Sequence, residues 1–135
     1  MFQFSQRSLE RREGVDPRLI EISDLAIQTS VIDFGIPEFG GLRTQKDQRG
    51  LFTQGSSRCD GITNKSFHQT GGALDVYAYV DGKASWEREH LAMVACAMLQ
   101  AASTLGYKLE WGGLWPWDMP HFQLVVQLNA LPPNL

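Results

Sequence analysis

The sequence predicts an α+β fold, a single domain in which a small and mostly antiparallel sheet packs against helices. Three observations lead to this class. The chain has 135 residues, which is close to the commonest size of one domain, and no repeat or linker divides it. Two long segments have apolar residues at helical spacing, and four short segments have the character of strands. These segments do not alternate regularly enough for a wound parallel sheet.

Two segments are predicted to be long helices. Asp16 is suited to cap the first one, the proline after it suits the first helical position, and the helix is expected over about residues 17–28. Ser85 is expected to cap the second, which ends before Gly106. Cys96 lies within its apolar run and is expected to be buried. The buried stripe of this second helix is expected to contain Leu91, Val94, Met98, Ala101 or Ala102, and Leu105.

Four short segments are predicted to be strands: "SVIDFGI", which ends at Pro37, and then "ALDVYAYV", "YKLEW" and "HFQLVVQL". The second of them, residues 73–80, alternates between apolar and polar side chains, as a half-buried strand does. Residues 42–65 are polar, rich in glycine and serine, and without sustained periodicity. Long stretches without regular structure are uncommon in compact domains and are usually functional or disordered, so we expect a binding loop here.

Composition argues against several classes of protein. The formal net charge is −3 and no dense run of lysine and arginine occurs, whereas nucleic-acid binding normally needs a basic surface. No apolar run approaches the roughly 20 residues that span a bilayer, and the N-terminal residues lack the apolar core of a secretion signal. Cys59 and Cys96 are isolated, so neither a zinc knuckle nor a disulfide framework is indicated. We therefore expect synthesis in the cytoplasm, no nucleic-acid partner, no membrane insertion and a monomer.

Two of the three histidines have surroundings that favour a functional site. His68 lies just before the strand that carries Asp75, and the two glycines between them allow the chain to fold back and bring the two side chains together. His121 begins another strand after Pro120, which disfavours a helical turn. The segment "DMPH" is therefore expected to be extended and to present Asp118 and His121 at the edge of the sheet.

Two imidazoles and one carboxylate form a recurrent catalytic zinc set, in which the fourth position stays open for water or substrate. Zinc lowers the pKa of bound water to about 7, and a nearby base must take the proton and return it to the leaving amine. Asp118, three residues before His121, is placed for that role. By residue type and spacing alone, an ordinary turn histidine, strand-end aspartate and core-edge histidine remain an alternative.

The residue patterns of two motifs are stronger evidence than the spacing. "SFHQTGGALD" has the pattern Ser-x-His-x-x-Gly-x-Ala-x-Asp, and "WGGLWPWDMPHFQL" joins a Trp-Gly-Gly segment to Asp-x-Pro-His-Phe. Both resemble the VanY-like D-alanyl-D-alanine carboxypeptidase family of zinc peptidases, and most of all its phage endolysin branch, the L-alanyl-D-glutamate endopeptidases. The resemblance extends over about residues 41–124. It implies that His68, Asp75 and His121 bind Zn²⁺ at the sheet edge.

The resemblance also implies roles for residues around the metal. Asp118 takes the position of the catalytic base and acid, and Glu110 is interpreted as a structural strand residue instead. Arg43 resembles an arginine that binds a substrate carboxylate or polarises the scissile carbonyl, as its charged, bidentate guanidinium allows. An ordinary surface arginine is the alternative. The candidates for substrate binding are Ser66, which resembles the motif serine that holds the substrate backbone, Gln48 and Gln69 in the cleft, and Trp115 and Trp117 as a hydrophobic wall or as simple loop packing.

The function that the resemblance implies is that of an endolysin, which hydrolyses the L-alanyl-D-glutamate bond in the stem peptide of peptidoglycan. The alternatives are a D,D-carboxypeptidase or D-alanyl-D-alanine dipeptidase with the same chemistry, and a non-catalytic zinc-containing binding domain. Residues 1–135 are expected to form one catalytic domain without a separate wall-binding domain. The enzyme is then expected to be made in the host cytoplasm and to reach the cell wall through a separate membrane pore.

Overall fold

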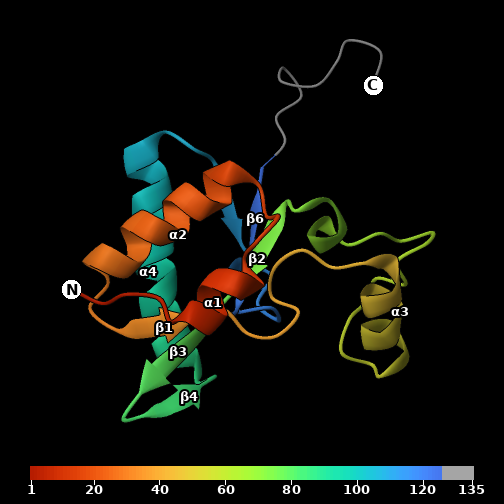
Figure 1. Ribbon diagram of the computed structural model, residues 1–135, viewed down its shortest axis with the longest axis horizontal. Coiled ribbons are helices and arrows are strands. Elements are labelled where there is room, and N and C mark those ends of the chain that lie inside the picture. Colours follow the sequence, from red (N-terminus) through yellow and green to blue (C-terminus); the bar gives the residue numbers. More distant parts are fainter. Residues whose placement is uncertain (126–135) are drawn as a thin grey trace.

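The computed structural model describes residues 1–125 and contains two three-stranded antiparallel sheets beside a pair of helices (Figure 1). One sheet has the strand order β1-β3-β4, and the other has the order β2-β6-β5. The strands are β1 (Asp33–Gly35), β2 (Ala73–Asp75), β3 (Tyr77–Val80), β4 (Lys83–Ser85), β5 (Leu109–Trp111) and β6 (His121–Leu124). The α+β class and the antiparallel pairing are confirmed, but the single expected sheet is two sheets.

The expected strand over residues 73–80 is divided at Val76. Residues before it pair with β6, and residues after it pair with β1 and β4. The N–H of Val76 donates to the carbonyl of Pro120 at 3.0 Å, at the corner where the chain passes from one sheet to the other. Alternation reports which face of a strand is buried, and this is confirmed for Leu74, Val76 and Ala78. Alternation does not indicate which neighbouring strand supplies the hydrogen bonds, so the break at Val76 was not predicted.

The two predicted helices are α2 (Pro17–Thr29) and α4 (Arg88–Leu105), and they pack against each other (Figure 1). The carboxylate of Asp16 accepts the N–H of Arg18 at the start of α2, and Gly106 ends α4 in the left-handed conformation with φ of 79°. The core between the helices and the sheets contains Leu19, Ile22, Ala26, Leu74, Val76, Val94, Met98, Ala101 and Phe122, each at most 2% exposed.

Two expectations about α4 were wrong. Ser85 belongs to β4, and the residue at the N-cap position is Glu87. The hydroxyl of Ser85 accepts the N–H of Glu87 and lies 2.7 Å from Nδ1 of His90, so it supports the approach to the helix instead of capping it. Cys96 is exposed, because α4 is covered on one side only and Cys96 lies on the other side.

The remaining helices are α1 (Gln6–Arg11), α3 (Gln45–Thr53) and two short 3-10 helices, η1 (Phe67–Thr70) and η2 (Gly112–Leu114). Residues 42–65 are thus not structureless, because α3 fills much of this stretch. The helix has a capping box, in which Thr44 and Asp47 bond each other's backbone N–H. Its mostly polar sequence lacks the apolar periodicity that indicates a helix, and the Thr-x-x-Asp spacing of the capping box was the available signal for its start. Together with the loop that follows, α3 forms a lobe beside the sheets (Figure 1).

Part of one expected strand lies outside the described residues. The segment "HFQLVVQL" is confirmed as β6 over His121–Leu124, and residues 126–128 of that prediction are not among the residues described. Among residues 1–125, no helix is long and apolar enough to cross a membrane.

Candidate metal centre and substrate pocket

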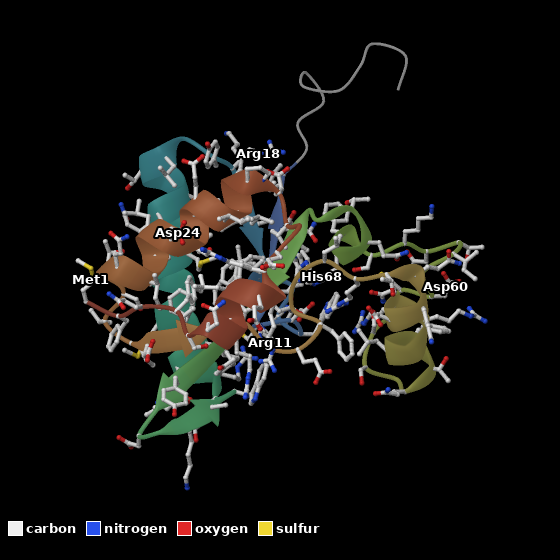
Figure 2. The ribbon with its side chains drawn as sticks, in the orientation of Figure 1. Met1, Arg11, Arg18, Asp24, Asp60 and His68 are labelled. Carbon is white, nitrogen blue, oxygen red and sulfur yellow. The ribbon has the colours of Figure 1, made fainter. Side chains whose placement is uncertain are left out.

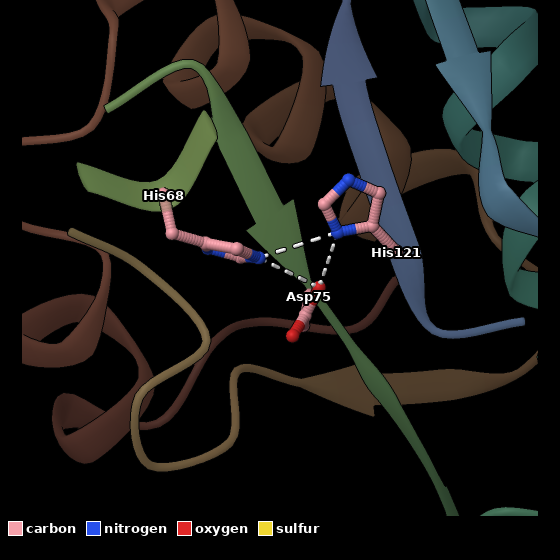
Figure 3. A group of neighbouring side chains, drawn as sticks. All are labelled: His68, Asp75 and His121. Atoms are coloured by element: carbon pink, nitrogen blue, oxygen red, sulfur yellow. Dashed lines mark hydrogen bonds and ion pairs between the residues drawn. The ribbon is translucent and has the colours of Figure 1, made fainter. Parts of the chain in front are cut away.

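His68, Asp75 and His121 converge at the edge of the β2-β6-β5 sheet (Figure 3). His68 lies on η1, while Asp75 ends β2 and His121 begins β6, and these last two residues are register partners. Nε2 of His68 lies 3.2 Å from Oδ1 of Asp75 and 3.2 Å from Nδ1 of His121. Nδ1 of His121 lies 3.0 Å from the same carboxylate oxygen. The expected convergence of the three side chains is confirmed.

The hydrogen bonds on the far side of each ring show that this donor set fits a metal ion. Nδ1 of His68 donates to the carbonyl of Gly41 at 2.9 Å, and Nε2 of His121 donates to Oε1 of Gln123 at 2.9 Å. The inner nitrogens therefore direct lone pairs at each other and at Asp75, which is unfavourable unless a cation lies between them. Tetrahedral ligands about 2.0–2.1 Å from zinc are roughly 3.3 Å apart, close to the separations found here.

The pKa shifts of Asp75 and His121 also indicate that a positive charge is favoured at the centre. Burial opposes ionisation of Asp75, but the charges and hydrogen bonds of His68 and His121 outweigh it and hold the Asp75 pKa well below its usual range. Burial likewise disfavours the charged imidazole of His121, but the hydrogen bond and charge of Asp75 prevail and raise the His121 pKa. The three side chains can hold a metal ion in place of the proton that His121 would otherwise bind.

Arg43 holds the carboxylate of Asp75 from the other side. Its Nη2 lies 3.1 Å from Oδ2 of Asp75, which turns Oδ1 toward the histidines. Nη1 donates to Oε1 of Gln48 at 3.0 Å, and Nε donates to the carbonyl of Phe39 at 2.7 Å. The side chain is only 11% exposed. Arg43 is therefore not an ordinary surface arginine, since its guanidinium is committed to the candidate metal ligand.

Two glycines position His68, by different means. Gly41, whose carbonyl accepts the His68 proton, lies so close to α1 that an added Cβ would be 2.1 Å from the carbonyl oxygen of Arg11. Gly71 ends η1 with φ of 79°, and its neighbour Gly72 has an ordinary backbone, so only one of the two expected glycines needs its conformational freedom. The sequence pattern gave no signal for Gly41.

Asp118 lies beside the centre, with Oδ2 3.9 Å from Nδ1 of His121. The segment "DMPH" is a turn and not the extended segment expected, because the N–H of His121 donates to the carbonyl of Asp118 at 3.1 Å. Gly112 allows this packing, since an added Cβ would lie 2.3 Å from that carbonyl oxygen. Burial, followed by the charge of Asp75, raises the pKa of Asp118 above the ordinary value of an aspartate.

The loop that carries Trp115 and Trp117 continues the wall of the site. The ring centre of Trp115 is 5.4 Å from that of His121 and 5.3 Å from that of Trp117. Nε1 of Trp115 donates to Glu110 at 2.9 Å, and the other carboxylate oxygen of Glu110 is 3.5 Å from Nε2 of Gln123. Glu110 is thus a structural residue that orients Trp115 and the hydrogen-bond partner of His121. A weak sequence signal pointed to Gln123, because it lies two residues after His121 and residues two apart on a strand share a face.

A pocket of about 550 Å³ opens over the centre. Ser66, which is 9% exposed, lies in its wall and accepts the N–H of His68. Gln48 and Gln69 do not line this pocket, unlike the expectation: Gln48 is fully buried, and Gln69 bonds the carbonyl of Gly61 and the N–H of Ser66. The charged and aromatic side chains around the pocket are Arg43, Arg58, Lys65, Phe67, His68, Asp75, Trp115, Trp117, Asp118 and His121.

An α+β domain with a His-Asp-His group and a carboxylate beside it has the features of a metal-dependent hydrolase. Residues 1–125 match the family model of the phage L-alanyl-D-glutamate peptidase, and the chain belongs to that family. It is 33% identical over 115 residues to the L-alanyl-D-glutamate peptidase of Escherichia phage T5, covering 84% of this chain and 82% of that protein.

A solved structure supports the same assignment. The crystal structure of the L-Ala D-Glu endopeptidase ChiX from Serratia marcescens superimposes with a TM-score of 0.81 at 38% sequence identity. The match covers 96% of this chain and 95% of that one. The resemblance to zinc peptidases of the phage endolysin branch is thereby confirmed at the level of family and fold.

Proposed function

We propose that this protein is a zinc-dependent endopeptidase that hydrolyses the L-alanyl-D-glutamate bond in the stem peptide of peptidoglycan. The observation that carries the proposal is the convergence of His68, Asp75 and His121 on one point, with Asp118 beside it, in a chain of this family. The activities for which the T5 and Serratia proteins are named support the choice of bond.

Zn²⁺ is the proposed metal because two imidazoles and one carboxylate, each already oriented by a second hydrogen bond, are ligands that it favours. When bound, it supplies a Lewis acid that activates water near neutral pH and stabilises negative charge on the carbonyl oxygen of the substrate. Asp118 takes the proton from the attacking water and delivers it to the leaving nitrogen. Its raised pKa suits the first half of this transfer, because a more basic carboxylate accepts the proton more readily.

The other residues of the pocket bind and orient the peptide. Trp115 and Trp117 form an apolar wall next to Asp118, which excludes water from one side of the site. Ser66, in the lining of the same pocket, is the proposed contact for the substrate backbone. Arg43 acts as a positioning residue, since its bond to Asp75 fixes which oxygen faces the metal.

The test of the bond is the product of digestion. Purified peptidoglycan is incubated with the zinc-loaded protein, and the soluble fragments are identified by mass and by labelling of new amino termini. We expect new N-terminal D-glutamate on the released peptides. Released D-alanine, with the L-alanyl-D-glutamate bond intact, would instead assign a D,D-carboxypeptidase or dipeptidase.

We also propose that the protein is a monomer, is made in the host cytoplasm and acts on the wall after release through a separate membrane pore. The chain's membership of a phage peptidase family supports this route. Expression in a bacterial host should leave cells intact until a pore-forming protein is supplied, and then cause lysis. Lysis without the pore protein would contradict the route, and sedimentation measures the oligomeric state.

A further inference from the structure

The pocket contains a cation that the proposed chemistry does not use. Two arginines and a lysine line it, and one of them, Arg43, is already committed to Asp75. Arg58 is different: its guanidinium carbon lies 3.9 Å from the ring centre of Trp117, so the group stacks on the indole. Among residues 1–125, its side chain makes no hydrogen bond or ion pair with the protein. A stacked guanidinium keeps the N–H groups of its edge free for a planar anion.

The backbone around Arg58 is held in place by the same network that holds the metal ligand. Nε2 of Gln48 donates to Oγ of Ser57 at 2.8 Å and to the carbonyl of Cys59 at 2.9 Å, so one buried amide holds the residues on both sides of Arg58. Oε1 of the same Gln48 accepts from Arg43. The loop that carries Arg58 is thereby connected through two side chains to Asp75.

The part of the loop that follows Arg58 in the chain is held in place as well. The carboxylate of Asp60 accepts the backbone N–H groups of Ile62, Thr63 and Asn64, at 2.8–3.0 Å. The side-chain amide of Asn64 in turn donates to the carbonyl of Arg58 at 3.2 Å. Asp60 lies on the lobe beside the segment that carries His68 (Figure 2), and its neighbours Arg58 and Cys59 line the pocket. Arg58 is therefore presented from a braced loop toward Trp117 and the space over the centre.

The substrate offers an anion at a matching place. In the stem peptide, D-glutamate is joined to the next residue through its γ-carboxyl group, so its α-carboxylate is free. That carboxylate is attached to the carbon next to the scissile nitrogen, which brings it close to the reacting bond. A planar guanidinium pairs with a carboxylate through two parallel hydrogen bonds.

We propose that Arg58 binds the free α-carboxylate of the D-glutamate residue and so selects substrates that carry this charge next to the scissile bond. The inference rests on the proposed function of the same site. Arg58 is chosen over Lys65 because its stack on Trp117 orders the group, whereas an ammonium is a flexible point charge.

The test compares two synthetic stem peptides that differ only at this group, one with the α-carboxylate of D-glutamate and one with the α-carboxamide, D-isoglutamine. The wild-type protein should cleave the carboxylate peptide with a kcat/KM about 10- to 100-fold higher, as expected for a charge-assisted pair. In Arg58→Ala, this preference should disappear, with most of the loss in KM on the carboxylate peptide and little change on the carboxamide peptide. Arg58→Lys should retain a part of the preference.

Arg49→Ala is the matched control, because it removes an exposed arginine of α3 that does not line the pocket, and its preference should equal that of the wild type. Equal loss on both peptides in Arg58→Ala, or equal cleavage of both by the wild type, would overturn the role of Arg58 and leave the proposed function standing. If the wild type cleaved neither peptide between alanine and glutamate, the proposed function itself would fail, and this inference with it.

Discussion

At the scale of single residues, the orientation of two imidazole rings determines what the site can bind. His68 presents Nε2 to the centre and His121 presents Nδ1, because the carbonyl of Gly41 and the amide of Gln123 accept the protons on the opposite nitrogens. Each ring therefore offers a lone pair inward without any change of rotamer. The candidate ligand set is pre-organised, and the second hydrogen bond of each histidine is as much a part of the candidate centre as the ring itself.

The role of Asp118 is tested by Asp118→Asn, which keeps the size of the side chain and removes its basicity. We expect kcat to fall by about 10²- to 10⁴-fold, because general acid–base catalysis contributes an effect of this order. Zinc content should not change, since Asp118 is not in the His-Asp-His group. Asp81→Asn, in the turn between β3 and β4, is the control and should retain full activity. Wild-type turnover by Asp118→Asn would show that another group moves the proton.

At the scale of secondary-structure elements, the centre depends on how three elements meet. The register of β2 and β6 places Asp75 directly opposite His121, and η1 brings His68 to the same edge. A one-residue slip of register would turn one of the two strand ligands to the other face. Behind η1, the end of α1 packs on the segment that contains Gly41. The elements contribute geometry that no single residue could impose.

This packing predicts a sharp difference between two glycines. Gly41→Ala should push the chain away from α1 and displace the acceptor of the His68 proton. We expect a loss of about 1–3 kcal/mol in the free energy of unfolding and a zinc affinity roughly 10- to 100-fold weaker. Gly50→Ala, in α3 where an added Cβ meets no atom within 4 Å, should instead be neutral or stabilising by about 0.5–1 kcal/mol and leave zinc binding unchanged. Differential scanning calorimetry and competitive zinc titration measure both; equal zinc affinities would contradict the argument.

At the scale of the whole molecule, the candidate metal centre connects the core of the protein to the α3 lobe. The α2–α4 pair and the sheets form the apolar core, and the α3 lobe lies beside them (Figure 1). Residues of the loop after α3 line the pocket together with Trp115 and Trp117. Arg43 and Gln48 run from the centre into that lobe. Binding of a metal at the centre should therefore stabilise the fold as well as activate the site.

The stability of the metal-free protein should depend on pH in a defined direction. Asp75 raises the pKa of His121 in the folded state, so protonated His121 contributes stability below the unfolded value of about 6.5, and this is lost as pH rises through the raised pKa. Zinc requires the unprotonated ring, so its stabilising effect should grow over the same range and reach about 2.7 kcal/mol at 100 times Kd.

Melting curves of metal-free and zinc-loaded protein, recorded from pH 6 upward in matched buffers, measure this effect. We expect the Tm of the metal-free protein to fall with rising pH and the difference between the two forms to widen. A difference that stays constant with pH would show that zinc and the proton do not compete at His121.

The sequence by itself determined the features whose signals are local. Asp16 and Gly106 mark helix ends because caps act within a few residues, and alternation identified the buried face of residues 73–80 because side-chain direction is set by the backbone period. The ligand types were recognisable for the same reason, since each motif is a short, contiguous pattern. That is why the meeting of His68, Asp75 and His121 could be predicted, while their binding of a metal stays a proposal.

Only the tertiary structure decided which distant groups meet. Arg43 is 32 residues from Asp75, and Gly41, whose carbonyl accepts the proton of His68, is 27 residues from it, and no local pattern encodes such pairs. The break at Val76, the exposure of Cys96 and the stacking of Arg58 on Trp117 likewise depend on neighbours supplied by other parts of the chain. Hydrogen-bond partners and packing faces are properties of the assembled molecule, because a side chain's environment is set by every element that surrounds it.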